Sequence, residues 1–165
     1  MTEKNEPLDI DLKKYKGEWN EASATPAWFE NNCERVTADY TIINDKQIKV
    51  DNTCFTHKVV CSNKTKSCQK VEKARKKIGK AFTTDRKDTI KVQFFPLVKA
   101  PYKVLYVDGG EGEQPYQHAI VSSGKYTWIL SRELKISPDK LKELKEKAEK
   151  LGRNINKLME KTEKM

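Results

Sequence analysis

Four cysteines are the residues of this chain whose spacing points most directly to chemistry. Cys33, Cys54, Cys61 and Cys68 could ligate zinc, but no two of them form a Cys-x-x-Cys pair, so the pattern gives little support for a metal site. Four cysteines allow three complete pairings. Two disulfide bonds fit the spacing better, and they would place the protein in an oxidising compartment. A free, reactive thiol remains the alternative.

Nucleophilic or acid–base catalysis would need a second group beside the reacting side chain. The chain has two histidines, His57 and His118, and neither has an evident partner in the sequence. An enzyme would therefore have to depend on Cys54 or His57. We predict no catalytic residue, no cofactor and no metal, and keep an enzyme as an alternative.

A run of basic residues gives the middle of the chain a strong positive charge. The formal net charge is +9. Much of it comes from a stretch with Glu72 as its only acid, made up of Lys58, Lys64, Lys66, Lys70, Lys73, Arg75, Lys76, Lys77 and Lys80. Such a stretch attracts an anionic membrane, an anionic ligand or a nucleic acid, or is simply a solvated surface. Because it lacks aromatic side chains on which bases could stack, no nucleic-acid partner is expected.

Periodic patterns predict the elements that would hold these residues in place. The 165 residues suit one domain with a buried core. Apolar and polar residues alternate over 36–42, 48–52 and 90–94, which is typical of half-buried strands, and a turn at 44–46 makes the first two a hairpin. The segment 69–82 is ambiguous because its apolar residues have helical spacing. We predict a strand there, since the preceding strand needs a partner.

A helix is predicted over residues 138–151, after the last strand. Ser137 is a candidate N-cap, Pro138 fits the first helical position and Gly152 is a natural stop. Its apolar face consists of Leu141, Leu144, Ala148 and Leu151. The polar tail, 157–165, is expected to fray. Many short strands followed by one amphipathic helix predict an all-β closed barrel with the helix packed outside.

Several segments, in order along almost the whole chain, resemble the lipocalin family. They start with the Gly-x-Trp signature at Gly17 and Trp19, continue through 36–40, 79–82, 91–95 and 116–121, and end with 126–132. The resemblance implies a single lipocalin domain over 1–165, with an eight-stranded antiparallel up-and-down barrel over about 17–132. It places the strands near residues 17–23, 34–43, 47–60, 69–83, 89–95, 102–108, 117–123 and 126–132.

The chain departs from the family pattern in three places. Asn20 stands where family members usually have a tyrosine, and Val107-Asp108-Gly109 is followed by an inserted loop, 110–115, expected at the closed end. The third departure is the long, lysine-rich region 55–78. It contains the glycosylation sequon Asn63-Lys64-Thr65, for which an unmodified polar turn is the simpler interpretation.

The strand order of such a barrel suggests how the cysteines pair. Cys33 and Cys54 would lie on adjacent strands near the open end, and Cys61 and Cys68 would face each other across a hairpin tip. The predicted disulfides are therefore Cys33–Cys54 and Cys61–Cys68, and a crossed pairing would mean a different strand register.

The resemblance also implies a floor and a function. Gly17, Trp19 and Arg132 would be structural, with the Arg132 guanidinium lying over the Trp19 indole at the closed end. The implied function is binding and transport of a small hydrophobic or lipid-like molecule, such as a fatty acid or a lysophospholipid. One alternative is a basic surface module that binds an anionic membrane or polyanion through the 55–78 hairpin. The other alternative is a lipocalin-type enzyme.

The ligand site is predicted from the alternate residues of each strand, which point into a barrel. Positions matching Tyr40, Asn52 and Trp128 line the pocket in members of the family. The predicted wall consists of Val36, Ala38, Tyr40, Ile48, Val50, Asn52, Ile90, Val92, Phe94, Trp128 and Leu130. The predicted mouth consists of Trp28, Phe29, His57, Lys58, Leu97 and Val98.

Charge at this mouth bears on the partners. Lys58, Lys64 and Lys66 would favour a ligand with a carboxylate or phosphate head group, and the apolar mouth residues would form an entrance or a lip touching an anionic membrane. The chain is expected to be a monomer or weak dimer. Paired cysteines predict a secreted protein or another oxidising compartment. Residues 1–7 lack the apolar core of a signal peptide, so either the protein is not exported or a leader has been removed.

Overall fold

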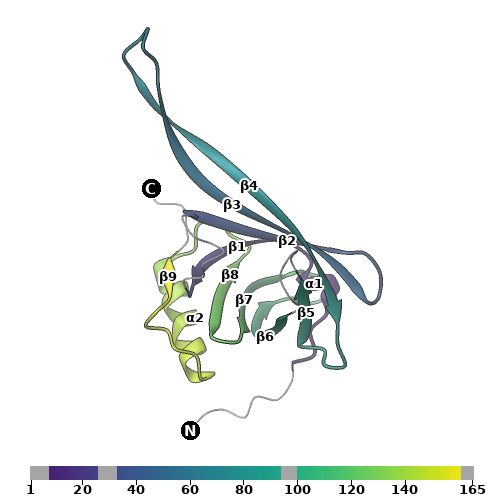
Figure 1. The fold of residues 1–165 in the computed structure, drawn as a ribbon. Coiled ribbons are helices and arrows are strands. Elements are labelled where there is room, and N and C mark those ends of the chain that lie inside the picture. The colour runs from purple at the N-terminus through teal and green to yellow at the C-terminus, as the bar shows by residue number, and fades with distance from the viewer. Residues whose placement is uncertain (1–7, 26–32, 94–99, 161–165) are drawn as a thin grey trace.

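The computed structural model describes residues 8–25, 33–93 and 100–160, and its centre is a closed antiparallel barrel. Its strands are β1 (Gly17–Ala24), β2 (Arg35–Ile42), β3 (Gln47–Cys61), β4 (Cys68–Thr83), β5 (Thr89–Gln93), β6 (Ala100–Gly109), β7 (Tyr116–Ser123) and β8 (Tyr126–Ser131). Each strand pairs with the next along the chain, and β1 pairs with both β2 and β8, which closes the sheet (Figure 1). The predicted eight-stranded up-and-down barrel is confirmed.

The ambiguous segment is a strand. β4 pairs with β3 without interruption from Gln47↔Phe82 to Cys61↔Cys68, so each residue of the segment 69–82 has a partner in β3. This long ladder outweighs the weak helical spacing, because four apolar residues at helical intervals would have no second layer to pack against.

Two short elements were not predicted from the sequence. α1 (Leu12–Tyr15) precedes β1 and is capped by the Asp11 side chain, which accepts a hydrogen bond from the Lys13 amide. β9 (Met159–Glu160) pairs with Ser23 and Ala24 of β1. The expectation that the whole tail frays is therefore wrong for β9. The pairing of β1 with β2 ends at Asn20, and β9 covers the edge of β1 that this leaves open.

The predicted C-terminal helix is present as α2 (Pro138–Lys150) and packs against the outside of the barrel. The Ser137 side chain accepts a hydrogen bond from the Lys140 amide, as an N-cap does. The buried face of α2 and the outward side chains of β1, β7 and β8 form a second core, made of Ala22, Ile120, Ile129, Leu141, Leu144 and Ala148. Across residues 8–25, 33–93 and 100–160, the helices are too short or too polar to cross a bilayer.

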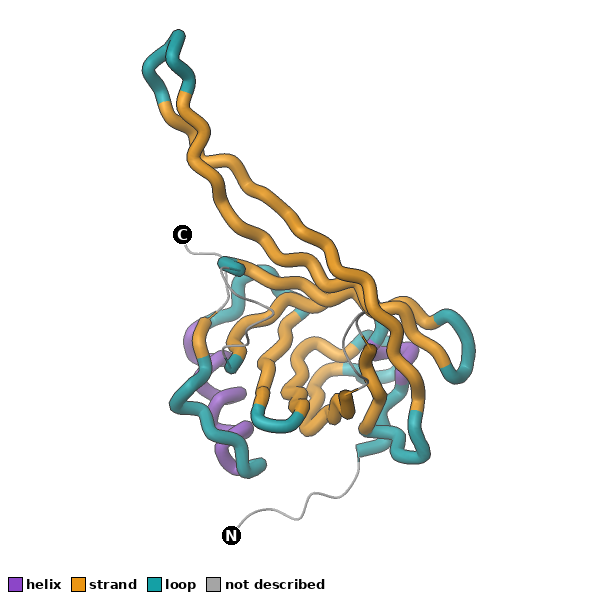
Figure 2. Tube along the Cα trace, in the orientation of Figure 1, coloured by secondary structure: helices purple, strands orange, loops and turns teal. Residues whose placement is uncertain are grey.

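β3 and β4 extend far beyond the barrel as a two-stranded ribbon (Figures 1 and 2). β2 accompanies β3 only as far as the Arg35↔Phe55 pair, and β5 accompanies β4 only from Lys80 onward. We call residues 56–73 the arm. In this part β3 and β4 pair only with each other, over about 20 Å of strand length.

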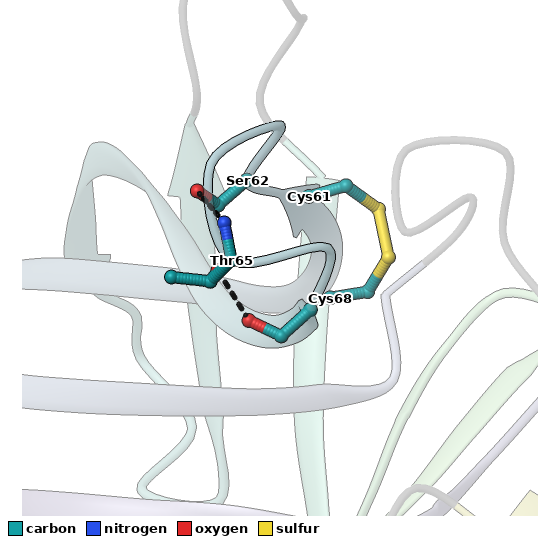
Figure 3. The surroundings of a disulfide bond; sticks show 5 residues. Cys61, Ser62, Thr65 and Cys68 are labelled. Atoms are coloured by element: carbon teal, nitrogen blue, oxygen red, sulfur yellow. Dashed lines mark hydrogen bonds between the residues drawn. A yellow bond between two sulfur atoms is a disulfide. The ribbon is translucent and has the colours of Figure 1, made fainter.

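The structure contains both predicted disulfides. Cys33–Cys54 ties the segment before β2 to β3, and Cys61–Cys68 joins the strands at the arm tip. Figure 3 shows that the tip is also held by the Ser62 hydroxyl, which accepts a hydrogen bond from the Thr65 amide at 3.5 Å. Two disulfides are typical of a protein from an oxidising compartment.

Candidate ligand-binding cavity

One end of the barrel is sealed by Arg132 and Trp19, in the contact that the resemblance implied. The Arg132 guanidinium lies 3.8 Å from the centre of the Trp19 ring, and the indole donates a hydrogen bond to the Tyr15 carbonyl at 2.8 Å. Trp19 is fully buried. Gly17 has a φ of +96°, and a side chain there would press on the guanidinium. The floor is therefore a packed layer without space for a ligand.

Arg132 also binds the backbone of the segment that enters the barrel. Its guanidinium donates hydrogen bonds of 2.8–3.1 Å to the carbonyls of Lys14, Tyr15, Lys16, Glu18 and Tyr116. Burial lowers the pKa of Arg132, but from so high a value that the side chain stays charged. One side chain thus fixes α1, β1 and β7 to one another, and the inserted loop 110–115 lies at this end, where Lys14 bonds the Gly110 carbonyl.

Above the floor the barrel encloses a cavity of about 500 Å³. Eight predicted wall residues line it: Val36, Ala38, Tyr40, Val50, Asn52, Val92, Trp128 and Leu130. Ile48 and Ile90 are buried in the core inside the barrel but do not line the cavity. Phe94 lies outside the described residues. Most of the predicted wall is therefore gathered around one space.

The register of β2 and β3 explains why these residues meet. Tyr40 pairs with Val50, Ala38 with Asn52 and Val36 with Cys54. Residues directly opposite on neighbouring strands share a face of the sheet, so the alternation in both strands points to the same interior. The Cys33–Cys54 disulfide lies in this wall as a consequence.

Three tyrosine hydroxyls form a hydrogen-bonded chain at the inner end of the cavity. Tyr102 bonds Tyr15 at 2.6 Å and Tyr40 at 3.0 Å. Burial raises the pKa of Tyr40 to about 12, and it raises the pKa of Tyr15 and Tyr102 well above the ordinary value. All three hydroxyls are therefore protonated at neutral pH. Tyr40 and Tyr102, which line the cavity, supply polar but uncharged groups to its inner end.

Trp128 provides the largest flat surface of the wall. Its ring stacks on Tyr102, with centroids 6.3 Å apart, and contacts Tyr126 at 5.9 Å. Its buried indole N–H has no hydrogen-bond partner in the described residues. Trp128 therefore contributes aromatic packing to the cavity wall.

The charged groups of the cavity are divided between its interior and its opening. Glu21 is buried and is the only acid among the described residues that line the cavity. Arg75, Lys76 and Lys77 line the cavity on the side where β3 and β4 leave the barrel, and all three are exposed. Cations at an opening attract an anionic group to that end.

The predicted mouth is only partly represented by the structure. Trp28, Phe29, Leu97 and Val98 lie outside the described residues. His57 and Lys58 lie on the arm and do not line the cavity.

The other two lysines expected near the mouth also lie away from the cavity. Lys64 and Lys66 lie at the arm tip, away from the cavity, because the ribbon projects from the barrel instead of folding over it (Figure 1). Among the described residues, the cations that line the cavity are instead Arg75, Lys76 and Lys77.

Several lining residues were missed by the sequence reasoning. Tyr126 could have been found, since it precedes Trp128 by two residues on the same strand and so shares its face. Tyr102 and Ser123 lie at strand ends whose alternation is short. Arg75 and Lys77 carried no such signal, because their inward orientation follows from their pairing with Cys54 and Asn52.

The cysteine and histidines considered for an enzyme all have partners in the structure. Cys54 is in a disulfide. His57 bonds the Glu34 carboxylate and lies 4.0 Å from Glu72, and His118 bonds Asp108 at 2.8 Å. Within the described parts of the chain, no group of three or more His, Cys, Asp or Glu side chains could hold a metal ion.

A closed up-and-down barrel with a sealed floor and an internal cavity defines a barrel protein built to enclose a small molecule. The family model described as a lipocalin-like domain matches residues 10–163. The chain belongs to the lipocalin family.

Known proteins similar to this chain come from bacteria, plants and animals. It is 31% identical over 155 residues to the outer membrane lipoprotein Blc of Citrobacter freundii, covering 92% of this chain and 78% of that protein. It is 32% identical over 174 residues to temperature-induced lipocalin-1 of Arabidopsis thaliana, covering 96% and 83%. It is 29% identical over 155 residues to apolipoprotein D of Mus musculus, covering 91% and 75%.

Among solved structures, lobster apocrustacyanin A1 shares the fold. Its TM-score is 0.67 at 14% identity, and the match covers 92% of this chain and 79% of that chain. This likeness supports the barrel topology alone. Members of the lipocalin family generally bind small hydrophobic molecules, and the cavity is the place where this chain would do so.

Proposed function

We propose that this lipocalin binds and carries one small hydrophobic or amphipathic molecule, such as a fatty acid or a lysophospholipid, in the barrel cavity. The observation that carries the proposal is the cavity of about 500 Å³, within the range of about 300–1,000 Å³ usual for small-molecule sites. Burial of the ligand's apolar surface would drive binding, at about 25 cal/mol per Å². No chemical step is required.

The distribution of polar groups supports an amphipathic ligand in one orientation. Its apolar part would lie against Val36, Val50 and Trp128, and an anionic head group would lie at the opening beside Arg75 and Lys77. Membership of the lipocalin family, whose members generally bind small hydrophobic molecules, agrees with such a cargo. The two disulfides support a secreted protein. We expect it to work as a monomer or weak dimer.

The test places a bulky side chain inside the cavity by substituting one residue of β5. Val92 lines the cavity, whereas the neighbouring Lys91 is exposed and faces outward. In a titration with dansylaminoundecanoic acid, Val92→Trp should weaken binding at least about tenfold, because the added ring occupies the space of the acyl chain. Lys91→Trp adds the same ring outside the barrel and should leave binding unchanged.

Extraction of the purified protein with organic solvent, followed by mass spectrometry, should release a lipid-like molecule. The proposal fails if nothing is released and the wild-type protein does not bind the probe. It also fails if Lys91→Trp and Val92→Trp weaken binding equally, since the probe would then bind outside the cavity.

A further inference from the structure

The arm has two faces of different character. In β3, Ile48 and Val50 point into the barrel, and each second residue beyond them continues the same face of the ribbon. In the arm this inner face carries Thr56, Lys58, Val60, Gln69, Val71 and Lys73. The outer face carries His57, Val59, Cys61, Cys68, Lys70 and Glu72. The alternation of strand residues thus sorts the arm side chains into two sets.

The outer face contains the only acid of the arm, and this acid is paired. Glu72 lies 3.7 Å from the Arg35 guanidinium and 4.0 Å from His57. On the inner face, neither Lys58 nor Lys73 has a carboxylate of the described residues within 4.0 Å. In formal charge, Lys70 and Glu72 cancel on the outer face of the arm, whereas Lys58 and Lys73 on the inner face have no acid to balance them.

Apolar side chains are exposed among these cations. Val60 and Val71 on the inner face are 48% and 44% exposed, and Val59 on the outer face is 66% exposed. Valine favours strands, but here no second layer covers it. A surface that mixes lysine with exposed aliphatic side chains fits the interface of an anionic bilayer, where lysine meets phosphate and valine enters the head-group layer. The arm has no Phe, Tyr or Trp, so it lacks the main stacking groups of a nucleic-acid site.

We propose that the inner face of the arm, with its tip, docks on an anionic phospholipid bilayer. Each lysine near such a surface strengthens binding by about fivefold. Arg75 continues the inner face toward the barrel and also lines the cavity, so the docked face leads directly to the cavity opening. Docking needs only the surface of the arm and does not depend on a ligand in the cavity.

The first experiment compares two double variants in a flotation assay with vesicles of phosphatidylcholine and phosphatidylserine. Lys58→Gln with Lys73→Gln removes the two inner-face charges of the arm and should weaken binding roughly thirtyfold. Lys70→Gln with Lys80→Gln removes one charge from the outer face of the arm and one from the outward face of β4 in the barrel, and should weaken binding less than about threefold. Binding should fall steeply with added salt and be absent on pure phosphatidylcholine.

The second experiment places a fluorescent reporter on each face. Val60→Trp should show a blue shift and be quenched by brominated lipid when anionic vesicles are added, whereas Val59→Trp on the opposite face should respond less. Unchanged far-ultraviolet circular dichroism would show that each variant is folded.

Four outcomes would overturn the proposal. The first is no binding to anionic vesicles, and if heparin is bound instead, the arm would be assigned to a soluble polyanion. The second is equal losses in the two double variants, and the third is a larger response at Val59→Trp than at Val60→Trp. The fourth is a concentration-dependent dimer formed through the arm without lipid, which would assign its free strand edges to a second copy of the chain.

Discussion

β3 and β4 each pass through two different environments, and the contrast shows what makes a strand stable. In the barrel, Val50 is 2% exposed and contributes to a core, whereas Val60, ten residues further on the same face of β3, is 48% exposed. Both parts have complete backbone pairing with β4. Only the barrel part has a second layer of side chains, so pairing alone must be supplemented in the arm by the Cys61–Cys68 disulfide.

The same contrast separates two guanidinium–ring contacts of almost equal geometry. Arg132 lies 3.8 Å from the Trp19 ring at the floor, and Arg35 lies 3.7 Å from the Phe55 ring on the outward surface where the arm begins. The floor contact is buried and tied to five carbonyl groups, while Arg35 has the partly exposed Glu72 as its ion partner. Burial and hydrogen bonding, not distance, should decide their energies.

The largest expected effect tests this pair of contacts. Arg132→Ala should lower the free energy of unfolding by about 4 kcal/mol, since it removes the cation–π contact with buried Trp19 and leaves five partly buried or exposed carbonyls without their charged donor. Arg35→Ala should lower it by less than about 1 kcal/mol. Chemical denaturation of both variants measures the difference. Similar losses in the two variants would mean that the Arg132–Trp19 contact stabilises the protein no more than the Arg35–Phe55 contact does.

A second prediction concerns the two disulfides. Replacing Cys33 and Cys54 together by serine should lower the free energy of unfolding by about 3 kcal/mol. The disulfide joins residues 21 apart in sequence, and its loss gives the unfolded chain more conformational freedom. The same change at Cys61 and Cys68 should cost no more than about 1 kcal/mol, because the arm tip can open locally without the barrel. Chemical denaturation measures the free energy of unfolding of both double variants. In the variant without Cys61–Cys68, limited trypsin digestion should show faster cleavage at the arm lysines than in the wild type. A larger loss at the tip would show that the arm unfolds together with the barrel.

A third prediction uses pH to isolate the barrel, since the arm contains no tyrosine. The pKa of Tyr40 is about 12 in the folded protein because of burial, against about 10 when unfolded. The contribution of neutral Tyr40 is therefore complete below pH 10 and is lost as the pH rises toward 12, by about 2 kcal/mol. Denaturation between these pH values should show a steeper decline for the wild type than for Tyr40→Phe. Parallel curves would mean that Tyr40 is not buried as described.

The smallest expected effect is that of shortening a valine of β3, at one position in the barrel and at one in the arm. Val50→Ala should lower the free energy of unfolding by about 1.5 kcal/mol, the value expected for removing two buried carbons. Val60→Ala should change it by less than about 0.5 kcal/mol, because its side chain is largely exposed. If the second change were as costly as the first, the arm would have to pack against another part of the protein in solution.

The sequence by itself determined the elements whose signals are local. Alternation over 36–42 and 48–52 predicted β2 and β3, and the cap at Ser137 with its apolar face predicted α2. The ordered motifs ending in Arg132 added the closed barrel and its floor, and the predicted strand positions agree with those observed to within a few residues. These features could be predicted because hydrophobic alternation, helix capping and the order of motifs can all be recognised in the sequence itself.

The tertiary structure alone decided the features that depend on register and on free edges. The 69–82 segment is a strand because β3 pairs with it throughout, and that register turns Arg75 and Lys77 toward the cavity. β9 exists because β1 has an open edge at Ser23. The basic hairpin projects from the barrel because β3 and β4 are longer than β2 and β5, the strands that flank them. No local sequence pattern indicates this difference in length. A strand's period says which residues share a face, but only its pairing says what that face meets.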